Sequence, residues 1–170
     1  MTHSALVISP ATTTADLQSA CEILIEVAKW LSSIGQPLWK PESLVASRIF
    51  PAPDAGIVYL ATIDGKPAGT FLLQNEDPVI WSDVPRGEAY YLHKLAVRRR
   101  FANQGLARQM LDFAVNETRA AGRRFLRLDC APRPKLCRVY ESAGFQFHSD
   151  RIMGTFQVRR YQRSTMRASE

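Results

Sequence analysis

A glycine that follows a run of basic residues, at the start of a predicted helix, is the feature of this sequence best suited to bind a phosphorylated ligand. The spacing of apolar residues predicts a helix over Asn103–Ala121, which places Gly105 in its first turn. That turn has unpaired amide N–H groups and a partial positive charge, and both attract phosphate. Glycine permits close approach, and Arg98–Arg100 add fixed positive charge. The segment therefore predicts a phosphate-binding turn.

Two common nucleotide-binding patterns are absent from the chain. It has no GxxxxGK[ST] segment, which argues against a P-loop NTPase. It has no GxGxxG segment either, so a dinucleotide-binding fold has no support. The predicted phosphate-binding turn therefore belongs to neither of these two classes of nucleotide-binding protein.

The segment Leu95–Leu111 resembles the acetyl-CoA motif of the GNAT N-acetyltransferase superfamily. The resemblance rests on LAV at 95–97, the basic turn, QGLA at 104–107 and ML at 110–111. It implies that backbone amides of the turn hold the pyrophosphate of acetyl-CoA. Ala102 stands where the family prefers Gln or Arg, so weaker ligand contact is expected there. The implied cofactor-binding residues are Leu95, Ala96, Val97, Arg100, Ala102, Asn103, Gln104, Gly105, Leu106, Ala107 and Arg108.

A second segment resembles the later GNAT motif and implies a proton donor. It comprises LDC at 128–130 and the stretch from Leu136 to Phe145. The resemblance implies that acetyl-CoA lies between the strand before the basic turn and the strand from Phe125. It also implies that Tyr140 protonates the departing thiolate, a role that suits a phenol within hydrogen-bond distance. Arg133 stands near a position where the family often has Asn, which puts that contact to the cofactor in question.

The general base is left open between three alternatives. An ammonium acceptor must lose a proton before its nitrogen attacks the thioester. Glu88 stands at the start of a predicted strand and can act through a water, whereas His93 lies within that strand and has a suitable unperturbed pKa. A chain of waters without a single base is the third alternative.

Aromatic residues and cysteines give weaker signals. Four aromatic residues are candidates for lining an acceptor pocket, with ordinary packing as the alternative: Trp39, Trp81, Tyr90 and Tyr91. Direct attack by the amine needs no enzyme nucleophile, so Cys130 and Cys137 are expected to be small core residues. Leu95 and Val97 are also expected in the core.

The elements that must position these residues form a mixed α/β pattern. Asp64-Gly65 is a strong hairpin signal between two strands. The predicted strands are 4–9, 56–63, 67–74, 88–97, 125–130, 145–148 and 152–159, and the predicted helices are 14–33, 41–50, 103–121 and 135–143. This order predicts the GNAT acyltransferase fold, with a central mixed sheet of about seven strands flanked by four helices.

Length and composition favour one ordinary globular domain over residues 1–170. Three cysteines without CxxC spacing predict neither a disulfide framework nor a metal site, and reduced thiols fit a cytoplasmic protein. No secretory signal is expected at the start, and no apolar run is long enough to span a membrane.

The resemblance implies an enzyme that transfers the acetyl group of acetyl-CoA to a primary amine by direct attack. Its partners would be acetyl-CoA and an unidentified amine acceptor, with a homodimer left open. A non-catalytic acyl-CoA-binding module is the alternative. The net charge of +6 raises nucleic-acid binding as a third hypothesis. The basic cluster lacks interleaved aromatic residues and is expected to meet CoA phosphates, so nucleic acid is disfavoured.

Overall fold

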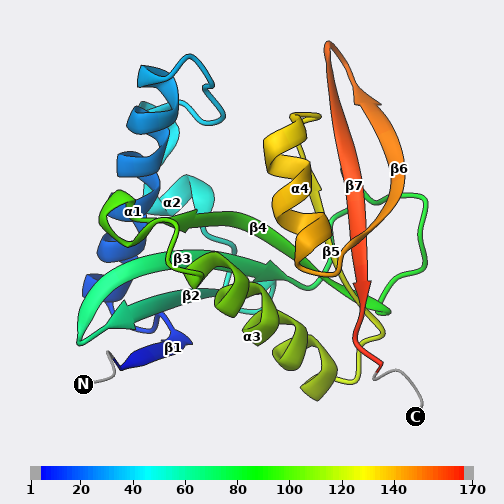
Figure 1. Cartoon of the computed structure of the whole chain (residues 1–170). Helices are drawn as coiled ribbons and strands as arrows, with labels where there is room; N and C mark the ends of the chain where they lie inside the picture. Colours follow the sequence, from blue (N-terminus) through cyan, green and yellow to red (C-terminus); the bar gives the residue numbers. More distant parts are fainter. Residues whose placement is uncertain (1–4, 167–170) are drawn as a thin grey trace. The chain divides into compact units, whose positions relative to one another are not determined.

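A computed structural model describes the protein over residues 5–166, and Figure 1 traces its elements. The chain forms two compact units, which we call the first and the second unit. The first comprises Met1–Leu73 and Lys94–Met110, and the second comprises Gln74–His93 and Leu111–Glu170. Strand β4 (Ala89–Val97) and helix α3 (Leu106–Ala120) each contribute residues to both.

The strands form a seven-stranded mixed sheet in the order β1-β2-β3-β4-β5-β7-β6. Strand β4 runs parallel to β5, whereas β1 is antiparallel to β2, and β5 and β6 are both antiparallel to β7. The remaining bounds are β1 (Leu6–Pro10), α1 (Thr14–Ser33), α2 (Ala46–Ile49), β2 (Gly56–Ile63), β3 (Lys66–Gln74), β5 (Phe125–Cys130), α4 (Pro134–Ser142), β6 (Gln146–Met153) and β7 (Phe156–Ser164). The predicted fold class is confirmed.

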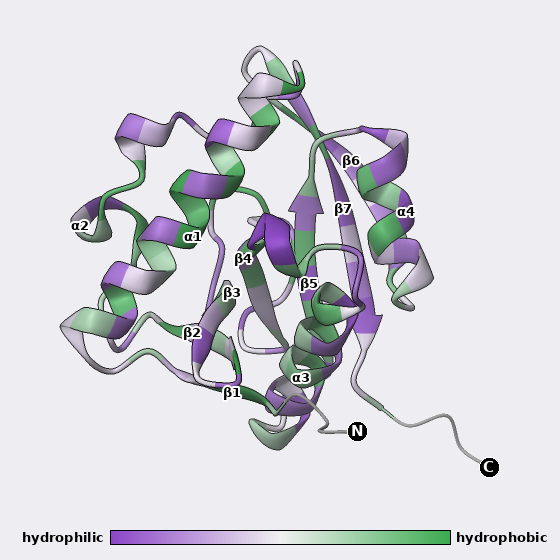
Figure 2. Cartoon of the chain, turned by 60° about the vertical axis from the view of Figure 1, so that its left-hand side comes forward, coloured by the Kyte–Doolittle hydropathy of each residue, from purple (hydrophilic) through white to green (hydrophobic). Residues whose placement is uncertain are grey.

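Helix α1 provides much of the core of the first unit. It begins with a capping box, in which the Thr13 side chain accepts from the Asp16 amide and the Asp16 carboxylate accepts from the Thr13 amide. Figure 2 shows hydrophobic and hydrophilic bands alternating along this helix, as expected for an amphipathic one. Its buried residues pack with Leu44, Leu60 and Ala96. The predicted bounds of α1 are confirmed.

The hairpin between β2 and β3 turns where the sequence predicts it. Asp64 and Gly65 both have left-handed backbone angles, with φ of 50° and 73°. Two successive positive φ angles define the tight turn that matches the twist of paired strands.

The predicted helix over 41–50 is wrong. The chain instead forms a short 3-10 turn at Pro41–Ser43 and the four-residue helix α2. Val45 between them is extended, with φ of −108° and ψ of 142°. Leu44 is buried against α1, so anchoring this side chain in the core interrupts the helical path.

The predicted turn between the last two strands, at residues 149–151, is also wrong. Strand β6 continues to Met153, and the turn comes at Gly154, which has a φ of 60°. Residues of the expected turn pair across the hairpin instead, with Ser149 opposite Arg160 and Asp150 opposite Arg159. Polar residues on an exposed strand have the same composition as a loop, so the sequence predicts the turn too early in the chain.

Candidate active site

The predicted phosphate-binding turn lies in the first unit, between β4 and α3. Helix α3 begins at Leu106, three residues after its predicted start at Asn103. Asn103 and Gly105 have φ angles of 60° and 81°, which a right-handed helix excludes. Left-handed residues alternating with ordinary ones turn successive N–H groups to one side, and such a concavity binds anions. The Ala102–Ala107 segment thus has two left-handed residues directly before the N-terminus of α3.

Two of the three arginines before this turn are bound to α1. Arg98 donates to Glu26 over 2.9 Å, and the Arg99 amide donates to the same carboxylate over 3.2 Å. The Arg99 guanidinium also lies 3.5 Å from the centre of the Trp30 ring. The expectation that the whole cluster meets cofactor phosphates is therefore wrong for these two side chains, which fix the loop to α1.

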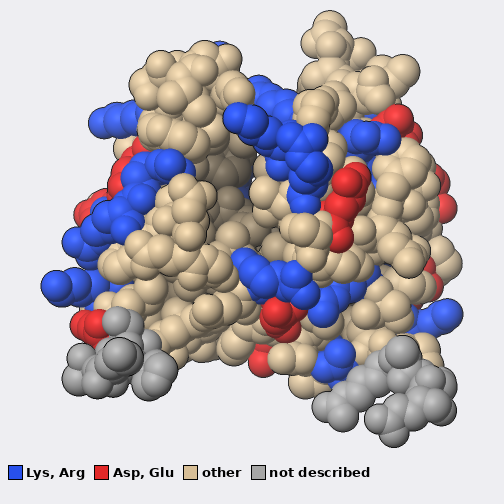
Figure 3. All heavy atoms as spheres, viewed as in Figure 1, with Lys and Arg blue, Asp and Glu red and all other residues tan. Residues whose placement is uncertain are grey.

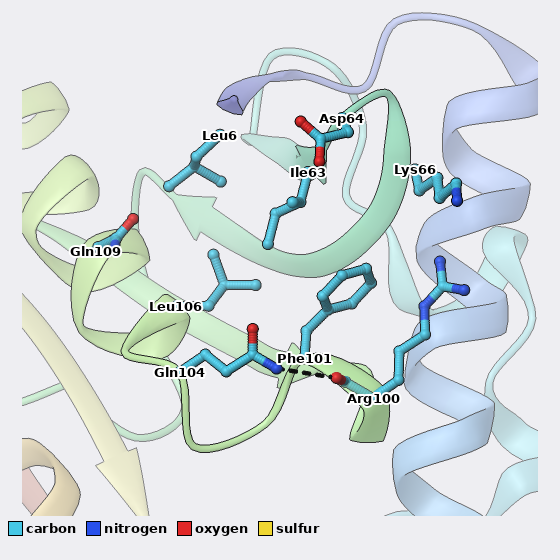
Figure 4. A pocket seen from close by; sticks show the side chains of 9 residues that line it. All are labelled: Leu6, Ile63, Asp64, Lys66, Arg100, Phe101, Gln104, Leu106 and Gln109. Carbon is cyan, nitrogen blue, oxygen red and sulfur yellow. Dashed lines mark hydrogen bonds between the residues drawn. The ribbon is translucent and has the colours of Figure 1, made fainter. Parts of the chain in front are cut away.

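Arg100, the third arginine, lines a pocket of about 450 Å³. Figure 4 shows the ends of the Arg100 and Lys66 side chains turned toward one another at one side of this pocket, with the Phe101 ring beside them. The Gln104 side chain, also in the lining, donates to the Arg100 carbonyl over 3.1 Å. One side of the pocket next to the turn is thus cationic.

The last residues of β4 carry a backbone irregularity. Lys94 has a φ of 55°, although it lies inside a strand and is not glycine. Its ammonium lies 5.2 Å from the centre of the Trp39 ring. Ala96 is buried in the core of the first unit, whereas Leu95 and Val97 are only partly buried, which corrects the expectation for these two side chains.

Glu88, a predicted base, is held in an ion pair in the second unit. Its carboxylate accepts from Arg127 over 2.5 Å, and the Arg127 side chain is only 4% exposed. A buried guanidinium at this distance fixes the position of the carboxylate. Glu88 is therefore suited to a structural role.

His93, the other predicted base, lies beside two carboxylates in the second unit. Its Nε2 is 3.4 Å from Oδ2 of Asp77, and Asp129 offers an oxygen in the same cluster. Neither aspartate is predicted from the sequence as a partner of His93. Asp77 lies in the predicted loop before β4 and Asp129 lies in β5, so no spacing in the sequence links them to His93.

Tyr140 lies in α4 with its side chain buried against other aromatic rings. Its ring centre is 6.0 Å from that of Phe145 and 6.4 Å from that of Tyr161. Burial, and then the nearby Cys130 and Asp129, raise the pKa of Tyr140 well above its usual value. The phenol is therefore protonated at neutral pH and available as a hydrogen-bond donor.

The cysteines do not have the properties of catalytic nucleophiles. Cys21, Cys130 and Cys137 are free and buried. Burial, with the nearby Cys137, raises the pKa of the Cys130 thiol far above its usual range, so the reactive thiolate is disfavoured.

Two of the four aromatic candidates belong to a core cluster. Trp81 and Tyr91 are 3% and 1% exposed and pack together in the second unit. The guanidinium groups of Arg127 and Arg160 lie 5.2 and 4.7 Å from the Trp81 ring centre. The packing alternative is thus confirmed for Trp81 and Tyr91. Tyr90 contacts Arg123, as Trp39 contacts Lys94.

The basic residues do not form one continuous patch on the face seen in Figure 3, where acidic groups lie among them. In the part of the chain that the structure describes, no helix combines the length and hydropathy that a membrane crossing requires.

Comparison with known proteins gives concordant results. The model of the acetyltransferase (GNAT) family matches residues 24–145. The chain is 30% identical over 141 residues to the uncharacterized N-acetyltransferase YesJ of Bacillus subtilis (strain 168), a match that covers 78% of this chain and 77% of the relative.

Solved structures share the fold. A GNAT-family acetyltransferase from Listeria monocytogenes 4b F2365 is 26% identical, with a TM-score of 0.73 and coverage of 94% of each chain. A GNAT-family acetyltransferase from Elizabethkingia anophelis with acetyl-CoA bound is 17% identical, with a TM-score of 0.60 and coverage of 94% of this chain and 97% of the other. The chain therefore belongs to the GNAT family and is an acetyl-CoA-dependent acyltransferase.

Proposed function

We propose that this protein transfers the acetyl group of acetyl-CoA to a primary amine by direct attack of the amine on the thioester. The observation that carries the proposal is the pair of left-handed residues, Asn103 and Gly105, immediately before α3. Left-handed residues just before a helix can turn backbone amides toward one side, where an anion binds. Free, buried cysteines also fit a reducing compartment such as the cytoplasm.

In this proposal the loop and the end of β4 bind the cofactor. Backbone amides of Ala102–Arg108 hold the pyrophosphate, and Arg100 adds positive charge beside them. Backbone groups of Leu95–Val97 hold the pantetheine arm and polarise the thioester carbonyl, as expected for amides aimed at a developing oxyanion. The acetyl-CoA seen in the Elizabethkingia anophelis relative supports this choice of ligand.

His93 is our choice of general base over Glu88. Glu88 is engaged by the buried Arg127, whereas His93 lies beside the carboxylates of Asp77 and Asp129. In this proposal His93 takes the proton of the acceptor ammonium, with the two carboxylates beside its ring. The neutral amine then attacks the carbonyl carbon of the thioester.

Tyr140 completes the proposed proton transfers. As the tetrahedral intermediate collapses, the C–S bond breaks and the leaving sulfur takes the proton of the Tyr140 hydroxyl. The attacking nitrogen releases its second proton to water, and water returns a proton to the Tyr140 phenolate. His93 releases the proton of the ammonium to solvent, so the products are the N-acetylated amine, CoA and one proton. Burial raises the pKa of Tyr140, so the phenol holds its proton until the C–S bond breaks.

A thermal-shift titration with acetyl-CoA and CoA, followed by a panel of amines read out by thiol release, tests the proposal. A ligand that binds only the folded state raises Tm. The panel contains a peptide N-terminus, an amino sugar, a polyamine and an arylalkylamine. Absence of any shift at millimolar acetyl-CoA would refute cofactor binding. A shift without thiol release from any amine would favour the non-catalytic module.

Tyr140→Phe tests the proton donor. Loss of a general acid lowers kcat by about 10² to 10⁴, whereas the Kd of acetyl-CoA should change little because the ring remains. Tyr161→Phe is the matched control, since the Tyr161 hydroxyl donates to Glu141 over 2.8 Å and its loss should lower Tm more than kcat. An unchanged kcat in Tyr140→Phe removes this residue from the mechanism.

A further inference from the structure

Asp77, His93 and Asp129 form a compact cluster in the second unit whose donor set suits a metal ion. They come from three segments, namely the loop before β4, β4 itself and β5. One donor atom of each residue lies within 4.8 Å of the other two. Nitrogen and oxygen donors at such distances can bind one cation together.

Asp77 is the anchor of this cluster. Its side chain is only 8% exposed. One carboxylate oxygen, Oδ1, accepts from the Val79 and Ile80 amides over 3.2 and 2.9 Å. The other, Oδ2, is buried and accepts no hydrogen bond from the residues that the structure describes. A buried carboxylate oxygen that accepts no hydrogen bond is costly, and a bound cation would offset that cost.

The spacing between Asp77 and His93 fits a shared metal ion better than a hydrogen bond. Their atoms Oδ2 and Nε2 are 3.4 Å apart. A charge-assisted N–H···O bond is shorter, at about 2.7–2.9 Å. Two ligands of a tetrahedral zinc ion, each about 2.0–2.2 Å from the metal, lie about 3.3–3.6 Å apart. The observed separation falls within that interval.

Asp129 supplies the third ligand at an end of strand pairing. The ladder between β4 and β5 stops at Leu92 and Leu128, so the next residues on the two strands are His93 and Asp129. His93 is 24% exposed and Asp129 is partly buried. The donor atoms Oδ2 of Asp77 and Nε2 of His93 are themselves buried. One imidazole and two carboxylates favour zinc or a similar divalent transition metal.

We propose that Asp77, His93 and Asp129 form a binding site for a divalent transition metal ion such as Zn²⁺. Coordination would occupy Nε2 of His93 and remove its lone pair from proton transfer. The ion would therefore inhibit acetyl transfer. This second statement rests on the proposed role of His93 as the base, whereas metal binding itself does not.

Metal binding is measured on the full chain after chelator treatment, without acetyl-CoA. Calorimetry with Zn²⁺ should give one ion per chain, and Co²⁺ should give the intense visible bands of a four-coordinate site. Asp77→Asn keeps the acceptor for the Val79 and Ile80 amides but loses a ligand charge. Because changes outside the coordination sphere already cost 10- to 100-fold in affinity, we expect a loss of about 100-fold or more.

Asp129→Asn is the second variant, because the Asp129 side chain is only partly buried and its replacement should disturb folding less than Asp77→Asn does. Circular dichroism checks that both variants are folded. His148→Gln is the matched control for incidental histidine binding, and its affinity should be unchanged. The site is refuted if Zn²⁺ does not bind at micromolar concentration, or binds equally well to both aspartate variants. Stoichiometric binding without inhibition would instead refute His93 as the base and leave the metal site standing.

Discussion

Replacing Gly105 with alanine separates backbone strain from cofactor binding. Gly105 has a φ of 81°, and a Cβ atom built on it meets no other atom within 4 Å. The fold therefore has room for the methyl group, and the only cost to the free protein is conformational. Bound pyrophosphate, in contrast, would occupy that space if it lies on the amides of this turn.

The expected magnitudes follow from these two effects. An L-residue in the left-handed region costs about 1–2 kcal/mol, and the loss of glycine freedom in the unfolded chain offsets about 0.4–1 kcal/mol. The net change of about 0–1.6 kcal/mol lowers Tm by at most about 6 °C in a protein of this size. Losing one or two charge-assisted bonds to phosphate, together about 2–4 kcal/mol, weakens acetyl-CoA binding by about 30- to 1000-fold.

Gly122→Ala is the matched control. Gly122 has a φ of 73° and equally open surroundings, but it follows the other end of α3, about 25 Å away along the helix axis. Both variants should lose similar stability in thermal unfolding, and only Gly105→Ala should lose affinity in calorimetry at fixed salt. Equal affinities in the two variants would refute pyrophosphate binding at this turn.

Two further predictions concern the loop and the stability of the second unit. Glu26→Gln should weaken acetyl-CoA binding by about two- to fivefold and lower the free energy of unfolding by about 0.5–1 kcal/mol, because the loop loses its charged anchor. The control is Glu22→Gln, since the Glu22 carboxylate is 54% exposed and 3.6 Å from Arg98, and it should change the free energy of unfolding by less than about 0.5 kcal/mol. Equal effects of the two substitutions would contradict the role of Glu26 as an anchor. Burial, and then two nearby arginines, lower the pKa of His148 below 6.5 in the folded protein. As pH falls, the unfolded chain therefore takes up a proton on His148 before the folded protein does. The stability contributed by the neutral imidazole is lost as pH falls through about 6.5 toward the folded pKa. Urea unfolding across this range should show a shallower pH dependence in His148→Gln, and an unchanged slope would exclude His148 as its source.

Elements with local boundary signals were predictable from the sequence. The capping box at Thr13 and the turn at Asp64-Gly65 place α1 and the first hairpin within a residue or two. Boundaries that depend on backbone angles or tertiary anchoring were not. Apolar spacing does not reveal the left-handed Asn103, and nothing local shows that Leu44 is buried and interrupts a helix.

Some residues of the candidate site could likewise be predicted from local sequence, whereas others depend on the tertiary structure. The phosphate-binding turn and Tyr140 come from contiguous motifs, so their assignment from the sequence was feasible, and their roles stay predictions. The pairing of Glu88 with Arg127, and of His93 with Asp77, depends on strand register and on a loop that folds back. A metal site built from three separate segments has no signature spacing. The single domain over residues 1–170 also stays a prediction.

Lys94 shows how a strand can be interrupted without glycine. Its left-handed backbone costs about 1–2 kcal/mol relative to a relaxed residue. A glycine would avoid that strain, but it would lose about 0.4–1 kcal/mol through its freedom in the unfolded chain. It would also lose the cation–π contact with Trp39, worth about 0.5–1 kcal/mol. Lysine and glycine are therefore nearly equal in free energy at this position, and an exchange between them has little effect on folding. A search for such irregularities by glycine alone would pass over Lys94.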